Sequence, residues 1–312
     1  MKGAKNANRA YEKSSAPVNF LQIDHRVENI SQPKGTIILP SSKAWENFPW
    51  VKSLFKIKPK EGYFIWVKEQ GDMPLSTCLT ISSPKTVQNL TNILVVEKNI
   101  KAKANVLCNS IKNNLCGTHK AKGKLILREG ASLEYSHIHK WGEKDFVNPD
   151  YEFFLEKDAK LVYNYQNLLP PEKLDLITSV HSKENSSVQM NFVINGVNSK
   201  INLKEKIFLE GDNAQGIMKL RLVGKKNSQI KAESSVVALA AGKGHLDCQG
   251  LLVDEKSTIF LSPEIICKNR LAQITHEASL GKISEEELNY LRMRGLKESE
   301  AIDLIVSGFL QA

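Results

Sequence analysis

The fold is decided by a polar bend that recurs along the chain, first as Arg128-Glu-Gly-Ala-Ser132 and then as Glu156-Lys-Asp-Ala-Lys160. Similar bends begin at residues 182, 210, 224 and 253, so successive starts differ by 28, 26, 28, 14 and 29 residues. Apolar and polar residues alternate in the short runs between the bends, which is typical of strands. The intervals between bends are close to one fixed length or to twice that length, and this regularity favours stacked coils. We therefore predict a β-solenoid rather than an antiparallel sandwich, whose turns would recur every 8–12 residues or so.

The same patterns divide the chain into three parts. Residues 1–62 form a mixed N-terminal region, in which Gly35–Leu39 is predicted as a strand and Ser42–Phe55 as a helix. Residues 63–269 form the mainly β core, and residues 270–312 form a C-terminal helical domain. In that domain Ser284 and Glu287 have the spacing of a capping box. We expect these helices either to cap the open end of the solenoid or to offer a docking surface.

Composition excludes several classes of protein. The 312 residues carry a formal net charge of +9, but the densest lysine clusters lack interleaved aromatic residues, so we expect no nucleic-acid partner. No apolar run approaches the ~18 residues of a membrane helix, and the amino end is polar, so we expect a cytoplasmic protein away from the membrane. Catalytic signatures such as GxSxG, HExxH and the phosphate loop are missing, which favours a protein that is not an enzyme.

Two short strings of residues carry potential metal ligands. His245-Leu-Asp-Cys248 places three donors within four residues, and His276-Glu277 adds two more. Cysteine, histidine and carboxylate together bind iron, zinc or an iron–sulfur cluster. Each string alone also fits a bland interpretation, in which Cys248 is packed in the core and His276-Glu277 is a surface pair.

The remaining cysteines and histidines are weaker candidates. His137 and His139 have strand spacing and share a face, where they either ligate a metal or, as we expect, line a polar strand edge. Cys108, Cys116 and His119 have no standard metal spacing and are interpreted as structural. Cys267 follows Ile265 and Ile266, so we expect it to be buried. These are expectations from pattern alone.

The last third of the chain resembles a known family. Two segments carry the resemblance: Thr275-His-Glu-Ala-Ser-Leu-Gly-Lys-Ile-Ser-Glu-Glu-Glu-Leu-Asn-Tyr-Leu-Arg-Met-Arg-Gly-Leu296 and Glu300-Ala-Ile-Asp-Leu-Ile-Val-Ser-Gly-Phe309. They are similar to the end of SufB and SufD, the scaffold subunits of the SUF iron–sulfur assembly machinery. The resemblance implies a right-handed parallel β-helix followed by a helical domain.

The resemblance also implies site residues. The essential SufB cysteine falls on Cys248, the SufB glutamate on Glu277 and the adjacent family histidine on His276, so the chain looks like the SufB type. Cys248 and Glu277 would then be the metal ligands. The family's sulfur-accepting cysteine aligns with His181, which is a departure from the pattern.

By the same resemblance, the chain implies a scaffold that binds a 4Fe–4S cluster transiently at a homodimer interface near the end of the β-helix. A SufC-like ABC ATPase would dock on the C-terminal helices, and apoproteins would be the clients. The shorter amino end suggests a minimal two-component version of the system.

Two other functions remain open at the level of sequence. A β-solenoid binding module for polysaccharide or protein would show an aromatic ladder along one face, and none is evident. A mononuclear metal hydrolase would use His245, Asp247 and His276.

Overall fold

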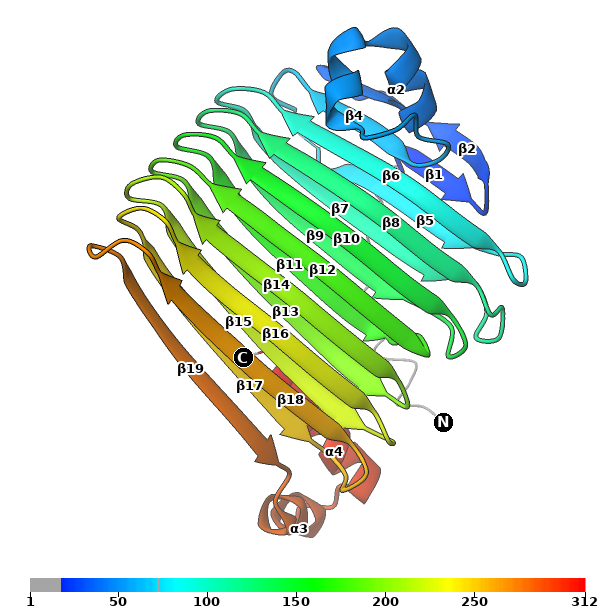
Figure 1. Cartoon of the computed structure of the whole chain (residues 1–312). Coiled ribbons are helices and arrows are strands. Elements are labelled where there is room, and N and C mark those ends of the chain that lie inside the picture. Colours follow the sequence, from blue (N-terminus) through cyan, green and yellow to red (C-terminus); the bar gives the residue numbers. More distant parts are fainter. Residues whose placement is uncertain (1–17, 72, 312) are drawn as a thin grey trace.

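The computed structural model describes residues 18–71 and 73–311, so residues 1–17 of the predicted N-terminal region lie outside the described residues. The chain is mainly β, with 57% of residues in strands, and forms a β-solenoid of about eight turns. The coils stack from the blue N-terminal end to the orange and red C-terminal end in Figure 1. This confirms the fold predicted from the spacing of the bends.

The strands form two sheets, and each coil gives one strand to each sheet. The ten-stranded sheet runs in the order β19-β17-β15-β13-β11-β9-β7-β5-β1-β2, and the nine-stranded sheet in the order β18-β16-β14-β12-β10-β8-β6-β4-β3. The strands of the first sheet are β1 (Phe20–Ile23), β2 (Arg26–Ile30), β5 (Leu75–Ile81), β7 (Lys101–Ser110), β9 (Ser132–Lys140), β11 (Lys160–Leu169), β13 (Ser187–Val197), β15 (Gln215–Lys225), β17 (Lys243–Leu252) and β19 (Gln273–Lys282). Those of the second are β3 (Thr36–Pro40), β4 (Tyr63–Val67), β6 (Val87–Val96), β8 (Thr118–Leu127), β10 (Phe146–Leu155), β12 (Lys173–Ser182), β14 (Lys200–Leu209), β16 (Gln229–Ala238) and β18 (Thr258–Cys267).

The coils stack in parallel register, which explains the spacing found in the sequence. Lys160 pairs with Ser187 and Lys200 with Gln229, so equivalent residues of successive coils are one coil length apart. The bends that begin at residues 128, 156, 182 and 210 all follow strands of the nine-stranded sheet. Those at 224 and 253 follow strands of the ten-stranded sheet, so the interval of 14 residues is half a coil.

Residues in the left-handed region of the backbone close the first set of bends. Asp158, Asn185 and Asn213 have φ values of 59°, 55° and 59°. Each donates its backbone N–H to a carbonyl of the following coil, over 3.0, 2.9 and 2.7 Å respectively. Asparagine and aspartate tolerate this conformation better than other residues with a Cβ. The bends therefore stack as well as turn.

The interior between the sheets is filled by alternate residues of every strand. Along β11, for example, Leu161, Tyr163 and Tyr165 are buried while their neighbours lie on the outer face. Five fully buried tyrosines, Tyr63, Tyr135, Tyr151, Tyr163 and Tyr165, give this interior polar groups among its aliphatic and aromatic side chains. The hydroxyls of Tyr151, Tyr163 and Tyr165 are hydrogen-bond partners of the buried side chains of Asn92, His137 and His139.

Two short helical elements of the N-terminal region cover the outer face of the first strands of the nine-stranded sheet. The predicted helix is two elements, α2 (Ser41–Asn47) and a 3-10 helix, η1 (Pro49–Leu54). The helix ends before Pro49 because proline disfavours helical backbone in the residue ahead of it, and Phe48 is extended. These elements lie beside β4 in Figure 1 and pack Ala44 and Val51 near Phe64.

The C-terminal region begins with a strand. β19 (Gln273–Lys282) pairs with β17, so the sheet runs past residue 269, and the domain boundary placed there stays a prediction. The capping box of Ser284 and Glu287 begins α3 (Glu285–Met293), as the sequence predicted, and Gly295 at φ 94° follows the end of the helix. α4 (Glu298–Gln311) packs Val306 on Val223 and Leu251, on the outer face of the ten-stranded sheet. Among the described residues, no helix is long and apolar enough to cross a membrane.

Candidate functional site

The two strings of potential ligands lie on adjacent strands at the open end of the solenoid. His245-Leu-Asp-Cys248 is in β17 and His276-Glu277 is in β19. In their parallel register Leu246 pairs with His276, Asp247 with Glu277 and Cys248 with Ala278. Residues that are about 30 positions apart in sequence are thus neighbours in the last ladder, because β19 is one coil further along.

Cys248 lies in the interior. Its residue is 1% exposed and belongs to the same buried cluster as Leu246. Burial, together with the carboxyl groups of Glu205 and Asp247, raises the pKa of the thiol to about 12, although Ser234 and Arg221 act the other way. The buried thiol is therefore protonated at neutral pH, and a metal cation has to displace that proton in order to bind the thiolate.

Glu277 lies on the outside. Its side chain is 65% exposed, and one carboxylate oxygen is 3.6 Å from Nε2 of His245. The other ring nitrogen of His245, Nδ1, is 2.9 Å from the hydroxyl of Thr275. His245, Thr275 and Glu277 therefore form a small polar group on the outer face of the last two strands.

Strand alternation determines which of the three predicted site residues share a face. Paired residues of neighbouring parallel strands point the same way, so Glu277 points outward with Asp247. His276 pairs with Leu246 and shares the inner face with Cys248, although it is exposed because no coil follows. The structure thus brings Cys248, His276 and Glu277 onto adjacent strands but not onto one face, and their common role as ligands stays a prediction.

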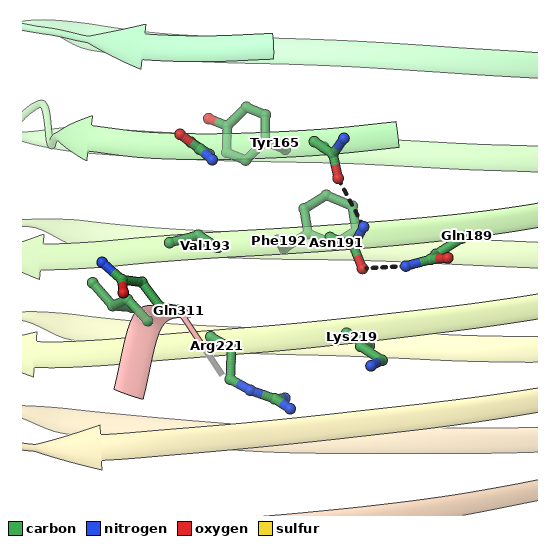
Figure 2. Close-up of a pocket in the computed structure, with 11 residues that line it drawn as sticks. Tyr165, Gln189, Asn191, Phe192, Val193, Lys219, Arg221 and Gln311 are labelled. Carbon is green, nitrogen blue, oxygen red and sulfur yellow. Dashed lines mark hydrogen bonds between the residues drawn. The ribbon is translucent and has the colours of Figure 1, made fainter. Parts of the chain in front are cut away.

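A buried ion pair adjoins the site on its outer side. Nη2 of Arg221 on β15 lies 2.7 Å from Oδ2 of Asp247, and both side chains are at most 10% exposed. Arg221 also lines a cavity of about 290 Å³ beneath the end of α4. Figure 2 shows Arg221 with Lys219, Gln311 and Asn191, which also line this cavity. The side-chain amide of Asn191 donates a hydrogen bond to Asn164 and accepts one from Gln189. Sequence reasoning missed Arg221, although one coil length separates it from Asp247.

A buried acid in the interior was missed as well. Glu205 on β14 is 1% exposed and accepts a hydrogen bond from the hydroxyl of Ser234 over 2.9 Å. Burial raises its pKa to about 8, and the Ser234 bond only partly offsets this. An alternating strand that carries glutamate at an inward position is the signal that could have identified it.

Two expectations about other residues are wrong. His137 and His139 do not line a polar strand edge: both are fully buried in the solenoid, and burial lowers the pKa of His137 to about 3. They lie next to Cys108, which is also buried. Cys267 is exposed rather than buried, because it ends β18, the last strand of its sheet, and no further coil covers it.

His181, at the position of the family's sulfur acceptor, lies on the outer face of β12. Its ring stacks between Phe154 and Phe208, with centroids 5.0 and 4.8 Å away, and its Nδ1 is 2.7 Å from Glu210. The ring is held by stacking and by a carboxylate. Nothing in this arrangement provides a nucleophilic sulfur.

Comparison with known proteins gives a consistent result. The family model described as SUF system FeS cluster assembly, SufBD core domain, matches residues 79–309. An iron–sulfur cluster assembly SufBD family protein of Methanothermobacter thermautotrophicus is 31% identical over 254 residues, 80% of this chain and 62% of the relative. One of Archaeoglobus fulgidus is 27% identical over 320 residues, covering 96% of this chain and 86% of the relative. The iron–sulfur cluster assembly protein SufB of Bacillus subtilis is 22% identical over 80% of this chain and 55% of its own length. This chain therefore spans about three fifths of the Methanothermobacter relative.

Proposed function

The chain belongs to the SufBD family of iron–sulfur cluster assembly proteins, and on that premise we propose that it is a scaffold subunit, without catalysis of its own, on which a nascent cluster is assembled and released. The cluster is cargo rather than a resident cofactor. The steps below concern the residues of this chain that would hold it.

The observation that carries the proposal is the unpaired and exposed edge of β19. This strand ends its sheet, so one of its edges has no neighbouring strand within residues 18–71 and 73–311, and nine of its ten residues are exposed. Unpaired strand edges favour pairing with another chain. A second copy seated on this end would form an isologous interface, in which both copies contribute the same residues. His276 and Glu277 lie in that strand.

The donor set suits temporary binding. Thiolate is the preferred ligand of iron–sulfur clusters, while imidazole and carboxylate bind iron more loosely. We place Cys248 as the thiolate ligand, with Glu277 and His276 as weaker ligands, and a 4Fe–4S cluster completed by the same residues of the second copy. Cys248 pairs with Ala278 of β19, whose side chain is small. Because β19 covers Cys248 on this side, a displacement of β19 would expose the thiol.

The C-terminal helices are the proposed docking surface for a SufC-like ABC ATPase. α3 has no buried residue, and Tyr290 and Met293 are 53% and 81% exposed. α3 follows directly on β19, with only Ile283 and Ser284 between them. A movement of the ATPase pair would therefore act on β19 and on the cluster site. Apoproteins are the proposed recipients, and the cytoplasm is the proposed compartment.

The two alternative functions have less support. In a mononuclear hydrolase His245, Asp247 and His276 would have to meet, but His276 points to the opposite face, and Asp247 is paired with Arg221. A protein-binding solenoid would also use the free edge of β19, but it would bind no iron or sulfide. The experiment below separates this alternative from the scaffold.

The test is anaerobic reconstitution with iron and sulfide, followed by counting both elements and recording the charge-transfer absorption. We expect the wild-type chain to bind a cluster and Cys248→Ala to lose it. Cys78→Ala is the control, since Cys78 is a partly buried cysteine in another strand of the same sheet and is not a proposed ligand. A cluster retained in full by Cys248→Ala would refute the choice of ligand, and no cluster in the wild type would refute the scaffold.

A further inference from the structure

Three potential metal ligands meet inside the solenoid, far along the chain from the proposed cluster site. Cys108 lies on β7, and His137 and His139 lie on β9, all at inward positions. Cys108 pairs with His139 in the ladder, and His137 is the next inward residue of the same strand. All three are fully buried, and their donor atoms lie within 4.8 Å of one another.

Hydrogen bonding satisfies only part of this group. Nε2 of His137 lies 2.9 Å from Nε2 of His139 and 3.5 Å from Sγ of Cys108. If His137 donates its Nε2 proton to His139, it has no lone pair left for the thiol. If it accepts a proton from His139, that lone pair is used, and the thiol again has no acceptor there. Since an unsatisfied buried donor costs free energy, this convergence calls for a different partner.

A cation at the centre satisfies all three donors. In a tetrahedral zinc site, metal–ligand distances of about 2.3 Å to sulfur and about 2.0 Å to nitrogen place sulfur and nitrogen about 3.5 Å apart and two nitrogens about 3.3 Å apart. The observed separations of 3.5 and 2.9 Å are close to these values. The third pair, Cys108 and His139, has its ligand atoms within 4.8 Å of each other.

The outer nitrogens of both rings are held in the manner of metal ligands. Nδ1 of His137 lies 3.3 Å from the hydroxyl of Tyr163, and Nδ1 of His139 lies 2.8 Å from that of Tyr165. A histidine that binds a metal generally donates a hydrogen bond from its other ring N–H. This bond fixes the tautomer, so the lone pair of the ligating nitrogen is directed at the metal. Both tyrosines are buried on β11, the adjacent strand, so the rings are oriented by the fold itself.

We propose that Cys108, His137 and His139 bind one thiophilic transition-metal ion, of the Zn²⁺ or Cu⁺ class, inside the solenoid. Hard ions such as Mg²⁺ prefer oxygen ligands and do not suit this set. The single negative charge of the thiolate balances the charge of Cu⁺, and the three ligands complete the coordination of that ion. Zn²⁺ takes a fourth ligand, and His119 offers one: its Nε2 is buried without a hydrogen-bond partner in the described part of the chain, and its ring centroid is 6.3 Å from that of His139. The proposal does not rest on the proposed scaffold function.

The first test measures metal in the full chain. The Cys248→Ala variant is produced in media supplemented with zinc or copper, purified anaerobically and analysed by mass spectrometry for both metals and for iron. Removing Cys248 prevents the proposed cluster ligand from contributing. We expect one equivalent of zinc or copper per chain. Adding Cys108→Ser should lower the affinity for that metal at least ~10-fold, since loss of a single supporting contact already costs that much, and the metal content should fall with it. Adding Cys78→Ser instead is the matched control and should change nothing.

The second test reads the ligands directly in the wild-type chain, so it holds even if a variant fails to fold. X-ray absorption at the edge of the bound metal should show one sulfur with two nitrogens for copper, or with three for zinc. A metal content that Cys108→Ser leaves unchanged would overturn the proposal. So would a coordination shell without sulfur, or no metal above the level of a blank.

Discussion

The thiol of Cys248 and the carboxylate of Glu277 lie on neighbouring strands of one sheet but point to its opposite faces. Within one chain the two groups are therefore separated by the sheet itself. A cluster that uses both has to sit at the free edge of β19, where inner and outer faces meet. That edge is also where a second copy would bring its own pair.

Replacing Glu277 tests the weaker ligand. Glu277→Gln keeps the size of the side chain but removes the charge, so we expect a cluster that forms and is lost several times faster to an added chelator. The measurement is the decay of the charge-transfer absorption under anaerobic conditions. Glu264→Gln, an exposed glutamate on β18, is the control and should decay as the wild type does. Equal decay of both variants would exclude Glu277 from the ligand set.

Charging the free edge tests the interface. Leu280 on β19 is 51% exposed, and Leu280→Arg would place two like charges across the proposed two-fold interface. We expect the dimer to dissociate, as measured by light scattering after gel filtration, while the circular dichroism spectrum stays that of a β protein. Ile177→Arg, at a 41% exposed position in the middle of the solenoid, should leave the mass unchanged. A dimer that survives Leu280→Arg would place the interface elsewhere.

Charging α3 tests the docking surface for the ATPase. Met293→Glu replaces an apolar side chain that is 81% exposed, and we expect the affinity for the SufC-like ATPase to fall at least ~10-fold, the usual effect of a central interface residue. Titration calorimetry measures it. Met73→Glu, at a 61% exposed methionine of the N-terminal half, is the control. Unaltered binding by Met293→Glu would remove α3 from the interface.

Glu205 makes stability depend on pH. Its pKa is raised from 4.5 to about 8 by burial, so in the folded chain it keeps a proton that the unfolded chain releases above pH 4.5. Folding stability therefore falls as pH rises from about 4.5 to about 8 and then levels off. One pKa unit corresponds to about 1.4 kcal/mol, so the loss amounts to a few kcal/mol.

Glu205→Gln removes this dependence. Urea denaturation at pH 5 and pH 9 should show a smaller loss of unfolding free energy across that range in the variant than in the wild type. The variant should also be the more stable chain at pH 9. The same loss in both chains would mean that Glu205 is charged, or solvated, in the folded state.

The solenoid could be predicted from sequence because its bends are local. Bends such as those at Asp158 and Asn185 use a polar residue that tolerates a left-handed backbone, and stacking places these bends at nearly constant intervals. The capping box of Ser284 and Glu287 is local too. Features of this kind are determined by a few consecutive residues, so they survive without knowledge of the rest of the fold.

The site could be predicted only in part, because alternation shows which residues share a face but not which face is inside. The pattern predicts His137 and His139 at a polar strand edge, yet both lie in the interior, where a tyrosine hydroxyl is the partner of Nδ1 in each ring. Cys267 was expected inside because of its apolar neighbours, yet it belongs to the last coil, which nothing covers. Where a stack of coils ends depends on the number of coils, and no local pattern encodes it.

Sedimentation velocity of the reconstituted chain tests the central claim most directly, when it is recorded both at the protein absorption and at the cluster absorption. The account predicts that the cluster absorption sediments only with the dimer, because one chain cannot present Cys248 and Glu277 on a single face. Cluster absorption that sediments with a monomer, at full iron and sulfide content, would contradict it.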